Sequence, residues 1–476
     1  MAKKNKKTEL VVIGAGPGGY AAAFHAADLG KQVTMIDPKE NPGGVCLFHG
    51  CIPTKALLHF AEVKEETYLA KEWGLDFKSL SVDIEKVRSW KEKVVNRLTG
   101  GLGQLSKARK VNFVRGTAKF KDKSKLEVEE HNGEGFTLEF EHAIIATGAR
   151  AASLPGVDFD HKLIMSAESA LDIKTVPEKL LVVGAGYIGL EMSVIYKALG
   201  SNITIVELQQ DIMPGLDKDL AAVFKKARKD LMDSTRFESK VTAAKKSKNK
   251  LRVTIENKDG ESETETFDAM LVAIGEVPNS ENVGLDKVGI ETDDKNFIRV
   301  NVFRQTNVEN IYAIGDVAGQ PLLAHKASHE GRVAAEHIAG EKTAYEPKAI
   351  PGIVFTEPEL AWVGLTEKEA KDQGRDIEIT KFPWSASGRA VALGQKHGLT
   401  KLIIDPETER LLGAGFAGKN AGTLVPEATL AIEMGAVAKD LELTIHPHPT
   451  LSETIMEAAE MFYGGATHVY KPKRKK

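Results

Sequence analysis

Cys46 and Cys51 are the only cysteines in a chain of 476 residues, and they lie five positions apart. A zinc site needs about four ligands, and no second cysteine pair exists to complete one. A structural disulfide here would close a short loop and restrain the unfolded chain little, and two inert buried thiols are the remaining alternative. Because the pair closely follows a glycine-rich nucleotide-binding signature, a dithiol that exchanges electrons with a bound cofactor is favoured.

That glycine-rich unit occurs twice. In each copy an apolar strand leads into a GxGxxG motif, a helical stretch and a second strand that ends in an acid. The glycines are Gly14, Gly16 and Gly19 in the first copy and Gly184, Gly186 and Gly189 in the second. The acids, Asp37 and Glu207, each lie 23 residues after the first glycine of their copy. A single motif of this kind is weak evidence, but two copies with matched spacing strongly indicate two dinucleotide sites.

Each unit suits a dinucleotide for physical reasons. The first two glycines allow a tight turn and the close approach of a pyrophosphate, and the third lets the helix pack on the strand. Free N–H groups at the helix N-terminus attract the phosphates, and the acid accepts hydrogen bonds from ribose hydroxyls. Glycine at these positions costs conformational entropy, so two such turns that bind nothing are a poor alternative.

Composition excludes several classes of function. Hydrophobic residues make up 42% and charged residues 28%, as in an ordinary globular protein. The net charge of -3 gives no basic field, so we expect no nucleic-acid partner. The chain shows neither an apolar run of membrane-spanning length nor a secretory signal pattern, so we expect no membrane contact and a cytoplasmic location. We interpret the basic residues at both ends as solvated tails.

Further strands are expected near 113–114, 126–128, 143–146, 269–274 and 311–314. From about residue 349 the sequence changes to alternating strands and amphipathic helices, such as 400–404 and 425–434, without a dinucleotide motif. We predict a separate domain for association there.

At this point the sequence resembles the pyridine nucleotide-disulfide oxidoreductases over nearly its whole length. The motifs that carry the resemblance are GGVCLFHGCIPTKALL at 43–58, ATG at 146–148, GAGYIGLE at 184–191, AIGDVAG at 313–319, TEPELAWVGLTEKEA at 356–370 and HPHPTLSE at 446–453. The last two favour the branch of the family that oxidises dihydrolipoamide. The implied fold is α/β, with an FAD-binding Rossmann-like domain (1–150), an NAD-binding one (151–276), a central domain that completes the FAD site (277–348) and a C-terminal α+β dimerisation domain (349–476).

The resemblance implies FAD at the first glycine unit and NAD at the second. The residues expected to hold FAD are Gly14, Gly16, Gly19, Asp37, Lys55, Gly116, Ala118, Asp316 and Ala324. Those expected to hold NAD are Gly184, Gly186, Tyr187, Ile188, Gly189, Glu207, Val241 and Gly275. The sequence itself bears on the choice of nucleotide, because Glu207 would repel a 2′-phosphate and residues 208–210 include no Arg or Lys to receive one. NAD is therefore favoured over NADP, and no metal is predicted.

The cysteine segment also has a catalytic logic. Cys51 begins a predicted helix with Pro53 in its first turn, and a helix N-terminus stabilises a thiolate. Lys55 lies four residues on, on the same face, and the resemblance implies that it pairs with Glu191. Since thiol exchange needs a base, the candidate is His448, oriented by Glu453. The His448–Pro449 bond is a candidate cis peptide.

The implied activity is oxidation of protein-bound dihydrolipoamide to lipoamide through Cys46, Cys51 and FAD, with hydride passed to NAD+. The implied partners are a second copy of the chain, which receives His448 across the interface, and the lipoyl domains and E2 core of 2-oxo acid dehydrogenase complexes or the glycine cleavage H protein. Alternatives are another flavin disulfide reductase, such as a glutathione-reductase-like enzyme, or an assembly subunit with secondary redox activity.

Three positions depart from the family pattern. Phe48-His49 stands between the cysteines where Asn-Val is usual, and His49 could shift the thiol pKa values or point away. Glu276 replaces an arginine beside the expected nucleotide, and Pro447 replaces a common alanine before His448.

Overall fold

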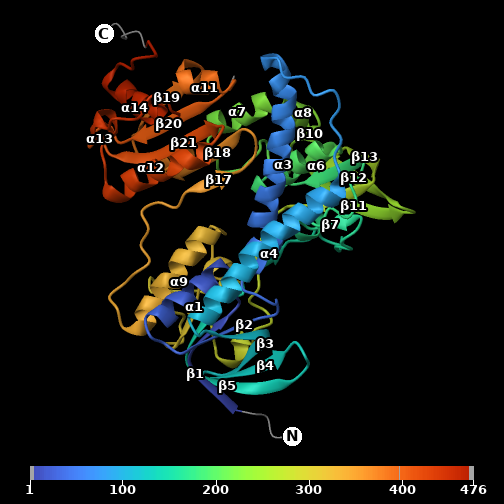
Figure 1. Cartoon of the computed structure of the whole chain (residues 1–476), viewed down its shortest axis with the longest axis vertical. Helices are drawn as coiled ribbons and strands as arrows, with labels where there is room; N and C mark the ends of the chain where they lie inside the picture. The colour runs from blue at the N-terminus through green and yellow to red at the C-terminus, as the bar shows by residue number, and fades with distance from the viewer. Residues whose placement is uncertain (1–4, 396, 471–476) are drawn as a thin grey trace. The chain divides into compact units, whose positions relative to one another are not determined.

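The first glycine motif directly follows strand β1 of a six-stranded sheet, and strands β1 to β5 of this sheet are labelled in Figure 1. Its strands are β1 (Asn5–Ile13), β2 (Val33–Asp37), β3 (Asn112–Asp122), β4 (Lys125–Glu130), β5 (Gly135–Ile145) and β16 (Ile311–Ala313). Strand β1 pairs in parallel with β2 and with β5, and β16 pairs in parallel with β5. The apolar run at 10–12 in β1 is fully buried, as expected for a parallel strand covered on both faces.

The computed structural model describes residues 5–395 and 397–470. The chain divides into two units, each discontinuous in sequence. The first contains residues up to 57, 79–175 and 274–346, and the second contains 58–78, 176–273 and the residues from 347 onward. The ends of both basic tails (1–4 and 471–476) lie outside the described residues. The four domain boundaries expected from the sequence stay a prediction.

Strand β3 changes partners along its length. It begins parallel to β2 and continues antiparallel to β4, and Gly116 stands where the change occurs. A Cβ on Gly116 would lie 2.3 Å from the carbonyl oxygen of Glu129, so only glycine fits this crossing.

Two helices far apart in sequence lie side by side in the first unit, α1 (Pro17–Asp28) and α9 (Ala324–Ala339) (Figure 1). A Cβ on Gly331 would lie 2.6 Å from the carbonyl oxygen of Gly18, so the two backbones approach closely. The remaining elements of this unit are α2 (Gly44–His49), the start of α3 (Cys51–Leu69), α4 (Ile84–Ala108), β6 (Ala149–Ala151), β7 (Ile164–Met165), α5 (Ala167–Ala170), β15 (Glu276–Pro278), η2 (Leu285–Lys287) and η3 (Gly315–Ala318).

The second unit repeats the plan of the first. Strands β10 (Thr235–Arg236), β9 (Asn202–Val206), β8 (Lys179–Val183) and β14 (Ala269–Val272) pair in parallel in that order. Helix α6 (Tyr187–Leu199) follows the second glycine motif, and α7 (Lys218–Ala227) and α8 (Lys229–Met232) come after β9. Strands β11 (Ser239–Ser247), β12 (Lys250–Asn257) and β13 (Ser262–Phe267) form an antiparallel sheet.

The C-terminal part of the second unit is an antiparallel sheet with helices. Its strands are β17 (Gly352–Val354), β18 (Glu359–Gly364), β21 (Leu411–Gly418), β20 (Leu399–Ile404) and β19 (Glu378–Pro383), in that order across the sheet. The helices are α10 (Glu367–Asp372), α11 (Gly388–Ala392), α12 (Ala421–Met434), α13 (Ala438–Leu443) and α14 (Glu453–Glu460), with η1 (Ala70–Trp73), η4 (Trp384–Ala386) and η5 (Met461–Tyr463) also in this unit. The core centres on Trp384, whose Nε1 donates to Thr400 Oγ1 at 2.9 Å.

A buried lysine joins α7 to this C-terminal sheet. The ammonium of Lys401 lies 2.7 Å from Asp217 Oδ2 and 3.2 Å from Asp219 Oδ1, and it also donates to Glu367. The three carboxylates have ligand atoms within 4.8 Å of one another, but the cation among them is Lys401. Burial opposes its charge, yet the hydrogen bonds to Asp217 and Glu367 hold the pKa of Lys401 above its ordinary value.

None of the helices among the described residues combines the length and the apolar character that crossing a membrane requires.

Candidate active site

The two cysteines lie on successive helices. Cys46 lies in α2, and Cys51 is the first residue of α3, as the sequence predicts. Gly50 separates the helices, and its carbonyl oxygen accepts from the backbone N–H of Thr54 at 3.1 Å and from the Thr54 hydroxyl at 2.6 Å. Both thiols are half-buried.

The thiols are not equivalent. A hydrogen bond to Cys51, followed by burial and the charge of Cys51, holds the pKa of Cys46 far above its ordinary value, and Lys55 opposes this only in part. Cys46 is therefore the protonated donor in this hydrogen bond. The expectation that Cys51 rests as a thiolate stays a prediction.

Tyr20 also faces the pair, and the sequence reasoning missed it. Burial, followed by the charges of Cys46 and Cys51, raises the pKa of Tyr20 to about 12. The sequence feature that could have identified Tyr20 is its position directly after Gly19. There it lies in the first turns of a helix whose N-terminus is expected to face a pyrophosphate.

The first glycine turn is shaped for a ligand and lies against the cysteine segment. Gly14 has a φ of 101°, and a Cβ on Gly19 would lie 2.0 Å from the carbonyl oxygen of Gly14. A Cβ on Gly44, just before Cys46, would lie 2.4 Å from the Cα of Gly16. Glycine at these positions thus brings a dinucleotide cradle and the redox pair together.

The acid at the end of β2 is tied to this turn. Asp37 Oδ2 accepts from the N–H of Ala15 at 2.8 Å, and Oδ1 accepts from the N–H of Lys39 at 2.9 Å. Burial raises the pKa of Asp37 although both hydrogen bonds lower it. Each carboxylate oxygen keeps a lone pair for a ribose hydroxyl.

Asp316 provides the second test of whether this unit fits FAD. It lies in η3, and its Oδ1 is buried without a hydrogen-bond partner among the described residues. Burial raises the pKa of Asp316. A buried acceptor without a donor is costly unless a ligand supplies one, so Asp316 fits the hydroxyl-rich ribityl chain expected there. Gly116 and Ala118 lie in β3, and Ala324 begins α9.

The second glycine turn reproduces the first almost atom for atom. Gly184 has a φ of 105°, and a Cβ on Gly189 would lie 1.9 Å from the Gly184 carbonyl oxygen. Glu207 Oε2 accepts from the N–H of Ala185 at 2.6 Å, and Oε1 accepts from the N–H of Gln209 at 2.8 Å. A Cβ on Gly186 would meet no atom within 4 Å, which leaves open space for a pyrophosphate.

The other residues expected at the NAD site are placed as follows. Tyr187 and Ile188 open α6, and Val241 lies in β11. Gly275, with a φ of 128°, follows β14 and belongs to the first unit. Their contacts with NAD stay predictions.

The candidate base has the expected carboxylate partner. His448 Nδ1 lies 2.8 Å from Glu453 Oε1, and the His448–Pro449 peptide is cis, as predicted. Burial opposes the shift, but hydrogen bonds from the Thr450 N–H and from His448 hold the pKa of Glu453 below its ordinary value. The ionised Glu453 thus fixes Nδ1–H, which leaves Nε2 free to accept a proton.

Lys55 and Glu191 belong to different units. Glu191 is buried in α6, and its Oε1 accepts from the N–H of Phe355 at 2.9 Å. The predicted ion pair between Lys55 and Glu191 stays a prediction.

His49, one of the three departures, turns toward a lysine. Its Nε2 lies 2.8 Å from Lys39 Nζ. Burial, and then the charge of Lys39, lowers the pKa of His49. Since an ammonium can only donate, the imidazole accepts this bond in its neutral form, so His49 adds no charge beside the thiols.

Glu276, the second departure, lies beside other acids. Burial, and then the charges of Asp316 and Glu168, raises the pKa of Glu276 to about 7. The side chain that replaces the family's arginine is therefore only partly ionised near neutral pH.

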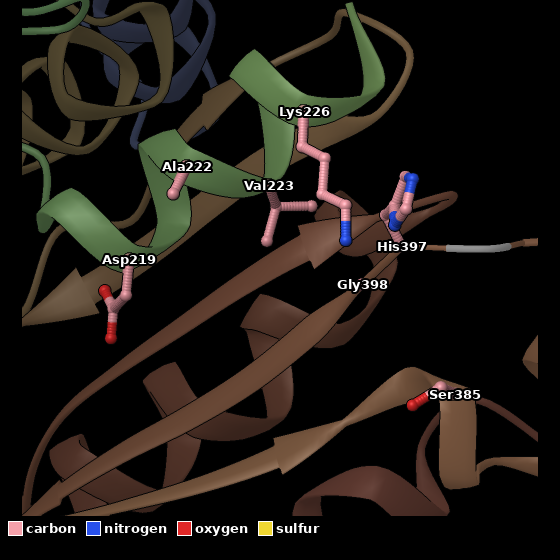
Figure 2. Close-up of a pocket in the computed structure, with 7 residues that line it drawn as sticks. All are labelled: Asp219, Ala222, Val223, Lys226, Ser385, His397 and Gly398. Carbon is pink, nitrogen blue, oxygen red and sulfur yellow. The ribbon is translucent and has the colours of Figure 1, made fainter.

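A separate pocket of about 290 Å3 lies in the second unit (Figure 2). Side chains of α7 line one wall, and Ser385, His397 and Gly398 line the other (Figure 2). It holds none of the residues that the sequence predicts for catalysis or cofactor binding.

Comparison with known proteins decides the family. The family model described as pyridine nucleotide-disulphide oxidoreductase matches residues 8–331, and that of the family's dimerisation domain matches residues 350–459. The chain belongs to this family. It is accordingly a flavoprotein disulfide oxidoreductase that uses FAD and NAD, with the α/β fold and the dimerisation domain that the sequence predicts.

Several relatives within the family are similar over the whole chain. Dihydrolipoyl dehydrogenase of Vibrio cholerae is 48% identical over 473 residues, which cover 99% of each chain. That of Haemophilus influenzae is 48% identical over 472 residues (99% and 98%), and that of Haloferax volcanii is 44% identical over 465 residues (97% of each).

Solved structures of the family superpose on the chain. LpdA from Mycobacterium tuberculosis has a TM-score of 0.89 at 25% identity, covering 95% of this chain and 99% of its own. The HOCl-induced flavoprotein disulfide reductase RclA from Escherichia coli has a TM-score of 0.83 at 26% identity, with the same coverage.

Proposed function

We propose that the chain oxidises dihydrolipoamide to lipoamide and reduces NAD+. The observation that carries the thiol chemistry is the hydrogen-bonded Cys46–Cys51 pair packed against the first glycine turn. The choice of substrate rests on full-length similarity to dihydrolipoyl dehydrogenases. The absence of basic residues at 208–210, directly after Glu207, supports NAD.

The protein residues supply thiol–disulfide exchange. In the oxidised state Cys46 and Cys51 form a disulfide. His448 accepts a proton at Nε2 from one substrate thiol, and the resulting thiolate attacks Cys46 Sγ. Cys51 leaves as a thiolate, which suits its place at the start of α3. The second substrate thiol then gives its proton to Cys46 as its sulfur displaces Cys46 from the mixed disulfide, so lipoamide is released and the pair is reduced.

When bound, FAD would supply the electron transfer that links oxidation of the reduced pair to hydride formation on NAD+. Asp37, Asp316 and the first glycine turn would hold FAD, and Glu207 and the second turn would hold NAD. Lys55 supports the Cys51 thiolate, and Glu191 is proposed to orient Lys55.

The active form is proposed to be a homodimer in which His448 and Glu453 act on the cysteines of the partner subunit. The proposed partners are lipoyl domains and the E2 core of 2-oxo acid dehydrogenase complexes, or the glycine cleavage H protein. A reducing compartment, the cytoplasm, suits a chain whose only cysteines are a catalytic pair.

A direct assay tests the proposal. The purified yellow protein should form NADH from dihydrolipoamide and NAD+, and Cys51→Ser should abolish this because no disulfide can form. Reduction of glutathione disulfide with NADPH as the main activity, or an unchanged rate in Cys51→Ser, would contradict it.

A further inference from the structure

The loop that carries His448 is held almost entirely by side chains. Among the described residues, no backbone-to-backbone hydrogen bond involves residues 445–449. In the single chain the His448 side chain is 74% exposed, so packing within its own subunit does not fix its position. Its geometry depends on how the two ends of the loop are tied.

The C-terminal end is tied to α14. Glu453 Oε2 accepts from the N–H of Thr450 at 2.7 Å, while Oε1 pairs with His448. The Thr450 hydroxyl donates to the Pro447 carbonyl oxygen at 2.7 Å. These contacts at the C-terminal end of the loop belong to the pair formed by His448 and Glu453.

The N-terminal end of the loop is held by a second histidine, His446. His446 Nε2 lies 2.7 Å from Glu427 Oε1 in the middle of α12, and His446 Nδ1 lies 2.9 Å from the Thr444 carbonyl oxygen. Thr444 is itself anchored, since its N–H donates to the Asp440 carbonyl oxygen at 3.1 Å. The His446 side chain is only 4% exposed, between two chain positions that face solvent.

Both partners of His446 can only accept hydrogen bonds, because one is a carboxylate and the other a carbonyl. Both bonds therefore exist together only when each ring nitrogen carries a proton, that is, in the imidazolium. A neutral ring turns a lone pair toward one of the two acceptors and loses that bond.

We propose that His446, as an imidazolium clamped between Glu427 and Thr444, is a positioning residue that fixes the loop bearing the base His448. The inference rests on the proposed function, and it adds a requirement: the base acts only while a second histidine two residues away stays protonated. His448 must be neutral to accept a proton and His446 must be charged, so the two rings need opposite states.

The surrounding charges favour this arrangement. Glu427 from α12 and Glu453 from α14 are the charged groups that face His446, and the uncharged Thr444 carbonyl follows α13. The hydrogen bond from Glu427 outweighs burial and holds the pKa of His446 above its ordinary value. The positioned state is thus complete at low pH and is lost as the pH rises through this raised pKa.

The variant Glu427→Gln distinguishes the proposed role of the charged His446 ring from a purely structural role of this residue. The amide that replaces the carboxylate in this variant can donate to Nε2 while Nδ1–H still donates to Thr444, so both bonds survive with a neutral ring. We expect the wild-type kcat for dihydrolipoamide to fall at alkaline pH with KM unchanged, and Glu427→Gln to abolish this fall. His446→Ala should lower kcat roughly tenfold to a hundredfold at pH values where the wild-type His446 ring is protonated, the cost of a misplaced catalytic group.

The exposed His131, in the turn between β4 and β5, gives a matched control. His131→Ala should keep the wild-type profile. An alkaline limb that is the same in wild type and Glu427→Gln would overturn the proposal, as would a wild-type rate in His446→Ala.

An NMR titration of the homodimer with 13Cε1-labelled histidine gives a readout free of turnover. The signal missing in His446→Ala should titrate above the ordinary histidine range in wild type and at lower pH in Glu427→Gln. A neutral His446 ring in wild type at neutral pH would overturn the positioning role. Failure to oxidise dihydrolipoamide at any pH would instead contradict the proposed function, and the ring state would still be measured.

Discussion

Cys46 and Cys51 differ in environment although they form one pair. Cys46 donates a hydrogen bond to Cys51, and Cys51 begins α3, where free N–H groups favour a thiolate. The sequence predicts a Cys51 thiolate from its place at a helix N-terminus, with Pro53 in the first turn and Lys55 four residues on. It could not predict Tyr20 beside the pair, because that approach depends on how α1 and α2 pack.

The asymmetry predicts how the thiols react. Replacing Cys51 with serine removes the main cause that raises the pKa of Cys46, so Cys46 should ionise at lower pH in Cys51→Ser than in the reduced wild type. Alkylation by iodoacetamide across pH, with peptide mass spectrometry to assign the site, measures this. An unchanged pH dependence of Cys46 labelling in Cys51→Ser would contradict this.

The raised pKa of Glu276 leads to a second prediction at the scale of single residues. Its pKa is raised from 4.5 to about 7, mainly by burial, so the folded state holds a proton that the unfolded chain releases between these values. The free energy of unfolding should therefore fall as the pH rises through this window, by at most about 3 kcal/mol. Glu276→Gln cannot ionise, so its apoprotein should match the wild type near pH 4.5 and exceed it in stability at pH 8. Equal urea unfolding curves at pH 8 would contradict this.

At the scale of elements, the two glycine units follow directly from the sequence. Gly14 and Gly184 need positive φ, and Gly19 and Gly189 sit where a Cβ would overlap a carbonyl oxygen. Such constraints are local, so matched spacing was enough to predict both βαβ units. The clamps formed by Lys401 and His446 are different, because each joins residues that are distant in sequence and carries no local pattern.

The buried position of Lys401 allows a prediction of how much it stabilises the packing of α7 on the C-terminal sheet. Its side chain is 0% exposed among Asp217, Asp219 and Glu367, so Lys401→Met would leave the buried Asp217 carboxylate without its cation. We expect a loss of about 3–5 kcal/mol in the free energy of unfolding. Lys381→Met is the matched control, because Lys381 pairs with Asp219 but is 42% exposed, and it should cost about 0–1 kcal/mol. Similar denaturation midpoints for the two variants would contradict the clamp.

At the scale of the whole molecule, the family resemblance predicts an active site that needs two chains, whereas the structure describes one chain. Cys46 and Cys51 belong to the first unit, and His448 and Glu453 to the second. Each half is formed within its own unit: the thiols pair with each other and the base pairs with its carboxylate. We propose that the halves meet when two chains associate through the dimerisation domain, and local sequence patterns do not describe such an association.

Subunit complementation tests that central claim most directly. A heterodimer of one Cys51→Ser subunit and one His448→Gln subunit, purified with two different tags, should contain one complete site formed by the intact cysteines of one chain and the intact base of the other. We predict about half the NADH-forming activity of the wild-type dimer, whereas both parent homodimers should be nearly inactive. A heterodimer as inactive as its parents would contradict a site shared between subunits.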